Sequence, residues 1–332
     1  MAMRVFVTHN SEDLDSYYAR ALGELRSIAT VTTNPRRRDL TTDELVEAAS
    51  GCDVIVAHRS TPGEAALFEA LPGLVAFLRT AVDISTIDVD AASAAGVVVG
   101  RADKSFVAST AELALALTLD VLRNVSESTI DYRAGGQPAQ RVGAQLRGRT
   151  AGVIGYGSIG RYLAESLRSL GVDVVVHDPH TDATADGFEQ ISFAELLERS
   201  DIVYPLAAST ADTVHLVDAA ALAAMRPGAV LVNVSRGELL DEDAVADAYD
   251  SGRLGGLAMD VGQAPDQRPS PDLAARRGVV ATPHLGGLTP ENADAQALSS
   301  VEQVRAMLAG EMPPRVVNPE RADRLRAWWA AR

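Results

Sequence analysis

Short apolar runs rich in β-branched residues alternate along the chain with stretches in which apolar residues recur at helical spacing. Near the amino terminus this periodicity predicts a helix over residues 13–28, and Thr41–Glu44 fits a capping box that begins another helix. The strands predicted in the first third of the chain are residues 4–8, 54–57, 74–78 and 97–99. Strands joined by helix-length connections predict a parallel sheet.

The pattern restarts after a long apolar helix, predicted over residues 105–122, and a polar stretch over residues 131–149. The strands predicted in this second series are residues 151–154, 173–177, 201–204, 229–233, 256–260 and 279–282. We therefore predict an α/β protein with two Rossmann-like, doubly wound parallel-sheet domains.

The composition is that of an ordinary globular protein, with 47% hydrophobic and 23% charged residues among 332. The 45 acidic against 30 basic residues give a net charge of −15, which repels phosphate backbones and anionic lipid. Neither nucleic acid nor a membrane is therefore an expected partner. The single cysteine, Cys52, excludes an internal disulfide and a cysteine-cluster metal site, and we expect no metal. Since no apolar targeting segment begins the chain, we expect a cytoplasmic protein.

A glycine-rich turn is the sharpest local signal. The segment GYGSIG follows a predicted strand and begins a predicted helix. Gly155 permits a tight turn, Gly157 lets the backbone approach a pyrophosphate, and Gly160 permits close helix–strand packing. Ser158 and Ile159 lie in the first helical turn, whose free N–H groups favour phosphate. By itself this motif also fits a plain glycine-rich turn between a strand and a helix.

An acidic residue makes the motif more specific. Asp178 follows the next predicted strand, 18 residues after Gly160. An acid there accepts hydrogen bonds from the adenosine ribose hydroxyls and repels a 2′-phosphate. No Gly-Lys-Ser/Thr follows the glycines, which excludes a P-loop. The sequence therefore predicts NAD as the cofactor.

Three residues with reactive side chains follow predicted strands further along the chain. Arg236 lies in NVSRG, Asp260 in LAMDV and His284 in TPHLGG. Because open α/β sheets bind ligands at the carboxyl ends of their strands, we expect all three at the crevice that holds a nicotinamide. The alternatives are a surface-turn role for Arg236, a capping or core role for His284 and a loop-tying role for Asp260.

These residue types suit the reduction of a 2-keto acid. A protonated histidine can donate the proton that the developing alkoxide needs, because its pKa lies near neutrality. A guanidinium can hold carboxylate and carbonyl oxygens with two hydrogen bonds and stabilise their charge. We therefore expect His284 and Arg236 as the catalytic pair, with a small 2-keto or 2-hydroxy acid as the substrate.

Together with GYGSIG and Asp178, the segments NVSRGELLDEDAVADA, LAMDV and TPHLGG resemble the D-isomer-specific 2-hydroxyacid dehydrogenase family. The resemblance implies that His284 is the acid/base, that Arg236 binds the substrate and that Asp260 holds the nicotinamide end. The further cofactor contacts that we expect are Thr213, Val234, Gly286 and Gly287.

The family also implies that one domain is inserted into the other. Residues 1–102 and 288–332 would form a discontinuous, flavodoxin-like substrate-binding domain, and residues 103–287 the NAD-binding domain. Family members commonly form homodimers through the long helix and the arm after it, here about residues 105–147. Because the chain ends soon after Asn318, we expect a short form without the regulatory domain of the longer phosphoglycerate dehydrogenases.

The sequence departs from the family pattern just after LAMDV. Family members place a Glu before a Pro in this loop, where it hydrogen-bonds the catalytic histidine; here Ala264 precedes Pro265. Gln263, Asp266 or Gln267 are the candidates to replace that Glu. A Gln can orient an imidazole ring, but it does not raise the pKa of the ring as a carboxylate does. An NAD-binding sensor with weak or no turnover is therefore the alternative to a dehydrogenase.

A second departure lies in the expected substrate-binding domain. Ala81 and Val82 occupy the turn whose amides bind the substrate carboxylate in family members, and Arg59 lies in a nearby loop that could add a contact. Asp83, if it faced this turn, would repel an anion and favour a substrate with hydroxyl or amino groups. Alternatively, Asp83 points to solvent or caps a turn. The sequence leaves the particular 2-hydroxy acid unidentified.

Overall fold

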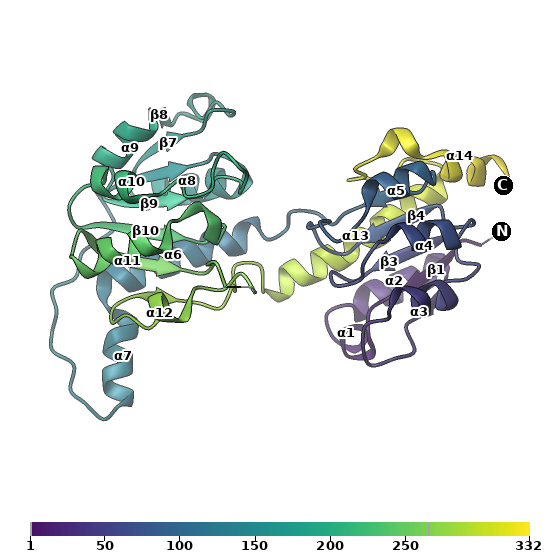
Figure 1. Ribbon diagram of the computed structural model, residues 1–332, viewed down its shortest axis with the longest axis horizontal. Coiled ribbons are helices and arrows are strands. Elements are labelled where there is room, and N and C mark those ends of the chain that lie inside the picture. Colours follow the sequence, from purple (N-terminus) through teal and green to yellow (C-terminus); the bar gives the residue numbers. More distant parts are fainter. Residues whose placement is uncertain (1, 265) are drawn as a thin grey trace. The chain divides into compact units, whose positions relative to one another are not determined.

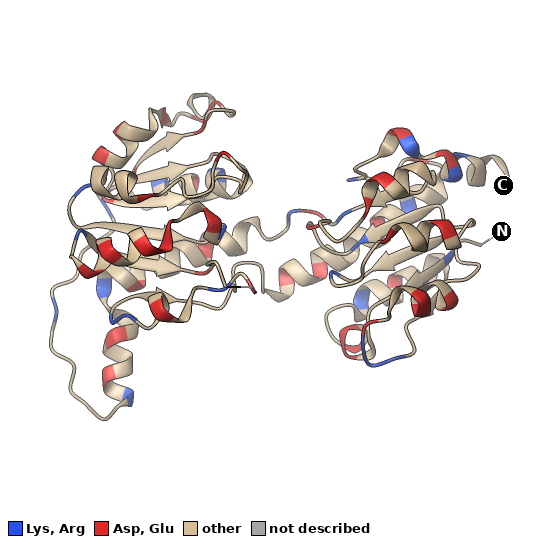
Figure 2. Cartoon of the chain, in the orientation of Figure 1, with Lys and Arg blue, Asp and Glu red and all other residues tan. Residues whose placement is uncertain are grey.

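The chain divides into two compact units in the computed structural model, which describes residues 2–264 and 266–332 (Figure 1). The first unit is formed by the residues up to Ser105 together with Pro290–Arg332. The second unit is Phe106–Thr289. Asp and Glu side chains are spread over helices of both units, as the strongly acidic composition requires (Figure 2).

The first unit is built on a five-stranded parallel sheet in the order β2-β1-β3-β4-β5. Its strands are β1 (Arg4–Val7), β2 (Thr30–Thr33), β3 (Val54–Ala57), β4 (Ala76–Arg79) and β5 (Val98–Gly100). This is the flavodoxin-like strand order, in which the chain changes direction across the sheet between β1 and β3. The prediction of a doubly wound, flavodoxin-like sheet is confirmed for this unit.

Helices cover both faces of this sheet. They are α1 (Ser11–Asp15), α2 (Ala19–Ile28), α3 (Thr42–Ala48), α4 (Ala65–Ala70), α5 (Val89–Ala94), α13 (Pro290–Ala309) and α14 (Asp323–Ala330), with a 3-10 turn η3 (Pro319–Arg321). Alternate residues of a strand point to opposite faces, so Val54 and Val56 pack with α2 and α13, whereas Ile55 and Ala57 pack with α3, α4 and α5.

The predicted helix over residues 13–28 is wrong, because the structure breaks it into α1 and α2. Ser16 leaves the helical conformation (φ −110°, ψ −114°), and the Tyr18 amide turns back to the Asp13 carbonyl at 3.1 Å. The Tyr18 ring is fully buried and its hydroxyl lies 2.7 Å from Ser300 Oγ on α13. This anchor fixes the chain at the break. The predicted capping box is confirmed, since Thr41 and Glu44 satisfy each other's backbone amides.

The second unit is built on a seven-stranded parallel sheet in the order β12-β11-β10-β9-β6-β7-β8. Its strands are β6 (Thr150–Ile154), β7 (Asp173–His177), β8 (Glu189–Gln190), β9 (Ile202–Pro205), β10 (Ala229–Asn233), β11 (Leu254–Met259) and β12 (Val280–Ala281). Read from β8, the first six strands follow the Rossmann order, with the switch point between β6 and β9. The predicted Rossmann fold is therefore confirmed.

Helices lie on both faces of this sheet as well (Figure 1). They are α6 (Val107–Arg123), α7 (Val125–Arg133), α8 (Ser158–Ser169), α9 (Phe193–Arg199), α10 (Ala219–Ala224), α11 (Glu242–Asp250) and α12 (Pro271–Ala274), with 3-10 turns η1 (Thr184–Asp186) and η2 (Gly237–Leu239). α6 and α8 pack on one face, and α9, α10 and α11 on the other. Among the described residues, none of these helices is long and apolar enough to cross a bilayer.

Helix α7 lies at the surface of the second unit. None of its residues is buried; Glu127 and Asp131 pair with Arg277 at 2.9 and 3.3 Å, and the Ser126 amide donates to Asp120 Oδ1 on α6 at 2.8 Å. Val125 and Tyr132 lie on the side away from this ion pair and are 54% and 67% exposed. The apolar side chains on this side of α7 are therefore exposed in the single chain.

Candidate active site

The glycine-rich segment forms the turn between β6 and α8, and two of its glycines are required by close contacts. Gly155 has φ +98°, and a Cβ there would lie 2.6 Å from the Ala207 amide nitrogen. A Cβ on Gly160 would lie 2.1 Å from the Gly155 carbonyl oxygen, which no side chain can tolerate without movement of the turn. The tight turn and the close helix packing expected from the motif are therefore present.

The amino end of α8 is open to a ligand. Gly157 is the N-cap and provides no side-chain cap, and a Cβ on Gly157 would meet nothing within 4 Å. A hollow of about 370 Å³ lies here, lined by Val107, Tyr156, Gly157, Ser158, Arg161, Tyr162 and Glu165. Ile159 packs instead against the hydrophobic core. Free N–H groups and a positive helix-dipole end make such a hollow suitable for a pyrophosphate.

Asp178 lies at the carboxyl end of β7 and holds the glycine turn. Its Oδ2 accepts the Tyr156 amide at 2.6 Å, and its Oδ1 accepts the amides of His180 and Thr181 at 2.7 and 2.9 Å. Partial burial pushes the pKa of Asp178 upward, but these three backbone hydrogen bonds outweigh it and leave the pKa below its ordinary value. A carboxylate is therefore fixed beside the turn, where ribose hydroxyls would reach it.

A network that sequence reasoning missed ties the turn to the segment before β8. The Tyr156 hydroxyl donates to Asp186 Oδ2 at 2.9 Å, and Arg161 also bonds this carboxylate. The Arg161 guanidinium lies 5.0 Å from the centre of the Tyr156 ring. Because burial and Asp186 both disfavour the phenolate, the pKa of Tyr156 rises to about 12. The only sequence signal was a large aromatic residue between two motif glycines.

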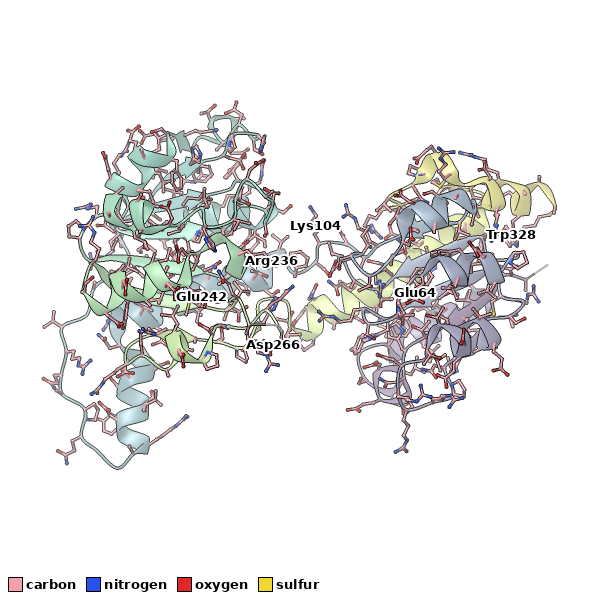
Figure 3. The ribbon with its side chains drawn as sticks, in the orientation of Figure 1. Glu64, Lys104, Arg236, Glu242, Asp266 and Trp328 are labelled. Atoms are coloured by element: carbon pink, nitrogen blue, oxygen red, sulfur yellow. The ribbon has the colours of Figure 1, made fainter. Side chains whose placement is uncertain are left out.

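The loop that carries Arg236 is held by its neighbours at the end of β10. The buried Asn233 side chain donates to the Arg236 carbonyl at 2.8 Å and accepts the Ser235 amide at 3.0 Å. Val234 is buried in the core, so it offers the loop only its backbone. The Arg236 side chain is exposed, with its Nη1 2.8 Å from the Ser235 carbonyl (Figure 3). The exposed guanidinium can therefore bind a ligand at the carboxyl end of the strands.

Two loops meet at a pair of glycines beside Arg236. A Cβ on Gly237 would lie 2.1 Å from the Gly262 carbonyl carbon. The loops after β10 and β11 therefore approach backbone to backbone, which sequence reasoning did not foresee. The two glycines themselves, Gly237 after Arg236 and Gly262 after Val261, are the sequence signal that could have indicated this close approach.

Asp260 organises the loop that carries His284. The Asp260 carboxylate is fully buried at the end of β11, and its Oδ1 accepts the Thr282 hydroxyl and the Leu285 amide, each at 2.6 Å. Its Oδ2 accepts the Gly286 amide at 2.8 Å. His284 lies between these anchors with φ +62°, a left-handed conformation that is uncommon for a residue other than glycine. The loop-tying contacts considered for Asp260 are thus present.

The three candidates to replace the family's Glu can be placed in part. The side-chain NH₂ group of Gln263 donates to the Leu240 carbonyl at 2.8 Å, and the backbone N–H of Gln263 donates to Glu242 Oε1 at 2.9 Å. Asp266, labelled with Glu242 in Figure 3, pairs with Arg268 at 3.1 Å. The Gln267 backbone is left-handed, with φ +61°. The Ala264-Pro265 step itself includes a residue outside the described part of the chain.

The two remaining expected cofactor contacts lie in loops at the same edge of this sheet. Thr213 Oγ1 donates to the Ala208 carbonyl at 2.7 Å and accepts the Thr210 amide at 2.8 Å, so it shapes the loop after β9. Gly287 follows the Asp260-anchored segment, and its carbonyl accepts the Thr289 amide at 3.1 Å.

In the first unit, Arg79 at the end of β4 joins the two loops in which we expected substrate contacts. Its buried guanidinium donates to the carbonyls of His58 and Thr61 and, at 2.9 Å, to Thr86 Oγ1. The loop after β3 includes the exposed Arg59. Burial outweighs the nearby Asp83 and lowers the pKa of Arg79 to about 10, which still keeps it a cation at neutral pH. The buried Arg79 side chain therefore holds the loops after β3 and β4 together through its hydrogen bonds.

The predicted carboxylate-binding turn follows β4 directly. Ala81 and Val82 are both half-buried, and the Ala81 carbonyl accepts the Ala102 amide at 3.0 Å. Asp83 is exposed, and its Oδ1 accepts the Ser85 amide at 2.9 Å, as expected of a residue that caps a turn.

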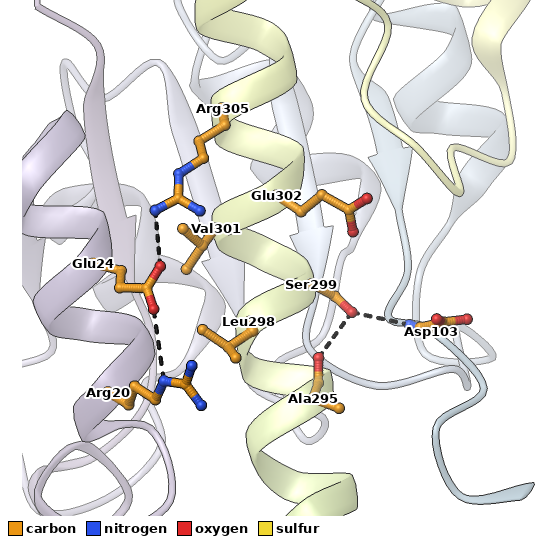
Figure 4. A pocket seen from close by; sticks show the side chains of 9 residues that line it. All are labelled: Arg20, Glu24, Asp103, Ala295, Leu298, Ser299, Val301, Glu302 and Arg305. Carbon is orange, nitrogen blue, oxygen red and sulfur yellow. Dashed lines mark hydrogen bonds and ion pairs between the residues drawn. The ribbon is translucent and has the colours of Figure 1, made fainter.

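A second hollow, of about 430 Å³, lies between α2 and α13 (Figure 4). Glu24 is held there between Arg20 and Arg305, at 3.6 and 2.8 Å, and Glu302 pairs with Arg315. Four of the five charged residues that line this hollow, Arg20, Glu24, Glu302 and Arg305, are thus held in ion pairs. The strand-end residues and the glycine turn remain the better candidates.

Known proteins resemble this chain in sequence and in fold. Residues 115–286 match the model of the D-isomer specific 2-hydroxyacid dehydrogenase NAD-binding domain. The chain is 37% identical to a D-3-phosphoglycerate dehydrogenase from Mycobacterium leprae over 279 aligned residues. The alignment covers 83% of this chain and 53% of that protein. The chain thus spans about half the length of that relative.

Two further relatives match most of both chains. An (S)-sulfolactate dehydrogenase from Chromohalobacter salexigens is 32% identical over 80% of this chain and 87% of its own. The crystal structure of a glyoxylate reductase from Paecilomyes thermophila superposes with a TM-score of 0.78 at 25% identity, over 96% of this chain and 99% of its own. The second unit, with its glycine turn and Asp178, is an NAD-binding domain. The chain belongs to the D-isomer specific 2-hydroxyacid dehydrogenase family.

Proposed function

We propose that this protein is an NAD-dependent dehydrogenase that interconverts a small D-2-hydroxy acid and the corresponding 2-keto acid. One observation carries the proposal: Arg236, Asp260 and the His284 loop follow β10, β11 and β12, three adjacent strands of the sheet that also carries the glycine turn. A binding protein has no need of a guanidinium and an imidazole at the edge where a nicotinamide would lie.

NADH, when bound, supplies a hydride to C2 of the keto acid. In our proposal the His284 imidazolium gives its proton to the oxygen on C2, which becomes the hydroxyl, and the neutral imidazole takes the proton back in the oxidative direction. Arg236 holds the substrate carboxylate and carbonyl oxygens and stabilises the negative charge that develops. Asp260 keeps the His284 loop in place through its three hydrogen bonds.

The residues around the glycine turn fit the cofactor. The amides at Ser158 and Ile159 begin α8 without a side-chain cap and would bind the pyrophosphate, and Asp178 would take the adenosine ribose hydroxyls. In the first unit, the amides of Ala81 and Val82 are our candidates for the substrate carboxylate, with Arg59 as a further contact. This assigns substrate binding to residues 1–102 and 288–332 and cofactor binding to residues 103–287.

The direct test is NADH oxidation by the purified protein against 2-keto acids of three to six carbons, with NADPH in parallel. We expect turnover with at least one acid and a clear preference for NADH, because Asp178 repels a 2′-phosphate. Tight NADH binding without turnover on any acid would contradict the proposal and favour the NAD-binding sensor.

Substitution of two motif glycines separates cofactor binding from folding. Gly157→Ala adds a Cβ in open space, so we expect unchanged thermal stability but NADH affinity lower by about 10-fold or more, because the methyl group occupies the approach to the pyrophosphate. Gly160→Ala forces the turn apart, and we expect it to lose about 2 kcal/mol of unfolding free energy, or roughly 4–8 °C in Tm. Calorimetry measures the melting temperature of each variant, and titration measures its NADH affinity. Equal melting temperatures for the two variants would contradict the different roles given to Gly157 in cofactor binding and to Gly160 in packing.

We further propose a homodimer formed through about residues 105–147, since α7 exposes Val125 and Tyr132 on one face. Tyr132→Asp places a charge on this face and is expected to shift the protein from dimer to monomer in light scattering. Leu170→Asp is the control, because Leu170 is 48% exposed on the unrelated end of α8. A monomeric wild type, or an equal effect of both variants, would argue against this interface.

A further inference from the structure

Two loops at the carboxyl end of the seven-stranded sheet are joined by side chains that the chemistry above does not use. One loop follows β10 and carries Arg236, and the other follows β11 and includes Gln263. The Gln263 side chain donates to the Leu240 carbonyl at 2.8 Å, and its backbone N–H donates to Glu242 Oε1 at 2.9 Å. We call these two contacts the Gln263 clamp; Glu242 and Arg236 are labelled in Figure 3.

The loop after β11 gives the clamp a firm support. The Gly262 N–H donates to the Gln267 carbonyl at 3.0 Å, and the Ala264 N–H donates to the Arg268 carbonyl at 3.3 Å, so the loop folds back on itself. A Cβ on Gly262 would lie 2.9 Å from Glu242 Oε1. The Glu242 carboxylate therefore packs directly against the backbone of this loop as well as accepting its N–H.

The Arg236 loop is held between the clamp and a second anchor. On one side the Val217 N–H donates to the Leu239 carbonyl at 2.9 Å, and on the other Gln263 donates to the carbonyl of Leu240. The Arg236 guanidinium itself bonds the carbonyl of the preceding residue in the same loop, at 2.8 Å. Because this bond is local, the place of the guanidinium follows the place of the loop backbone.

We propose that Gln263 and Glu242 are positioning residues for the reaction, which fix the Arg236 loop so that the guanidinium meets the carboxylate and carbonyl oxygens of the substrate in one orientation. This inference rests on the proposed function. It gives the loop after β11 a task that requires an amide side chain, because an NH₂ group can donate to the Leu240 carbonyl and an ionised carboxylate cannot.

Gln263→Glu separates this role from the one considered above, in which Gln263 replaces a Glu that supports His284. In the clamp, a carboxylate repels the Leu240 carbonyl and displaces the Arg236 loop, so we expect KM for the keto acid to rise about 10-fold with NADH affinity unchanged. Gln263→Met, which keeps the length but has no donor, should change KM in the same direction. A Glu that served His284 would instead raise the pKa of the imidazole and increase keto-acid reduction at alkaline pH. That gain would overturn the inference.

Glu242 is tested by two variants and a control. Glu242→Ala removes the acceptor of the Gln263 N–H and should also raise KM for the keto acid, whereas Glu242→Gln keeps an oxygen there and should restore KM to within about 2-fold of wild type. Asp243→Ala is the control, because Asp243 is exposed in the same first turn of α11 and its loss affects the helix dipole equally. A lower Tm and kcat in Glu242→Ala at unchanged KM would show a merely structural role and overturn the inference.

A readout without turnover keeps the inference separate from the proposed function. Hydrogen exchange of the backbone amides of residues 236–241, measured on the full chain with NADH, should be faster in Gln263→Met and Glu242→Ala than in wild type, and unchanged in Asp243→Ala. Faster exchange in a protein that turns over no keto acid would contradict the dehydrogenase and leave the clamp standing. Turnover with wild-type exchange and wild-type KM in every variant would overturn the clamp and leave the dehydrogenase standing.

Discussion

His284→Asn is expected to reduce the turnover of 2-keto acid by about 10²- to 10⁴-fold, the usual contribution of a positioned general acid. Asn is the sharper substitution because His284 has φ +62°, a conformation that Asn tolerates better than most residues. The loop should therefore keep its shape while the proton donor is lost. Steady-state NADH oxidation measures the loss, and calorimetric titration should show NADH affinity within a few-fold of wild type.

His215→Asn is the matched control, since His215 is also left-handed, with φ +54°, and exposed in the same unit. It should leave turnover unchanged. A His284→Asn protein that keeps more than about a tenth of wild-type kcat would remove His284 from the acid/base role. His284→Ala adds backbone strain at the same position and should lose activity and some stability together.

The features that were predictable from the sequence are those that local pattern specifies. Apolar runs placed most of the strands, although not β2 or β8, and the spacing of three glycines placed the turn at Gly155–Gly160. The close approach of Gly160 to the Gly155 carbonyl and the Thr41–Glu44 capping box join residues a few positions apart, so the local sequence contains their signal. The close approach of Gly155 to Ala207 after β9 is not local.

The features that sequence reasoning missed depend on partners distant in the chain. The helix over residues 13–28 breaks because Tyr18 is anchored to Ser300, 282 positions away. The contact of Gly237 with Gly262, and the bond of Tyr156 to Asp186, likewise join separate loops. Hydrophobic periodicity records which face of an element is buried, but not what a buried hydroxyl or backbone group will meet.

Asp260→Ala is expected to cause the largest loss of stability among single substitutions at the site. It leaves three donors without an acceptor: the Thr282 hydroxyl and the amides of Leu285 and Gly286. Each orphaned group costs about 1 kcal/mol or more, so we expect a loss of about 3 kcal/mol in unfolding free energy, or roughly 6–12 °C in Tm. Because the His284 loop loses its anchor, kcat should fall by about 100-fold or more even where the protein remains folded.

Asp260→Asn distinguishes an anchor from a group that contacts the substrate. The amide oxygen can still accept from Thr282 and Leu285, while its NH₂ group faces the Gly286 amide and loses that single bond. We therefore expect intermediate stability and a kcat between those of wild type and Asp260→Ala, with KM for the keto acid little changed. Asp250→Asn, which removes an exposed ion pair with Arg276 in the same unit, should alter neither value. If Asp260→Asn raised KM and left kcat and Tm at wild-type values, Asp260 would act on the substrate and not on the loop.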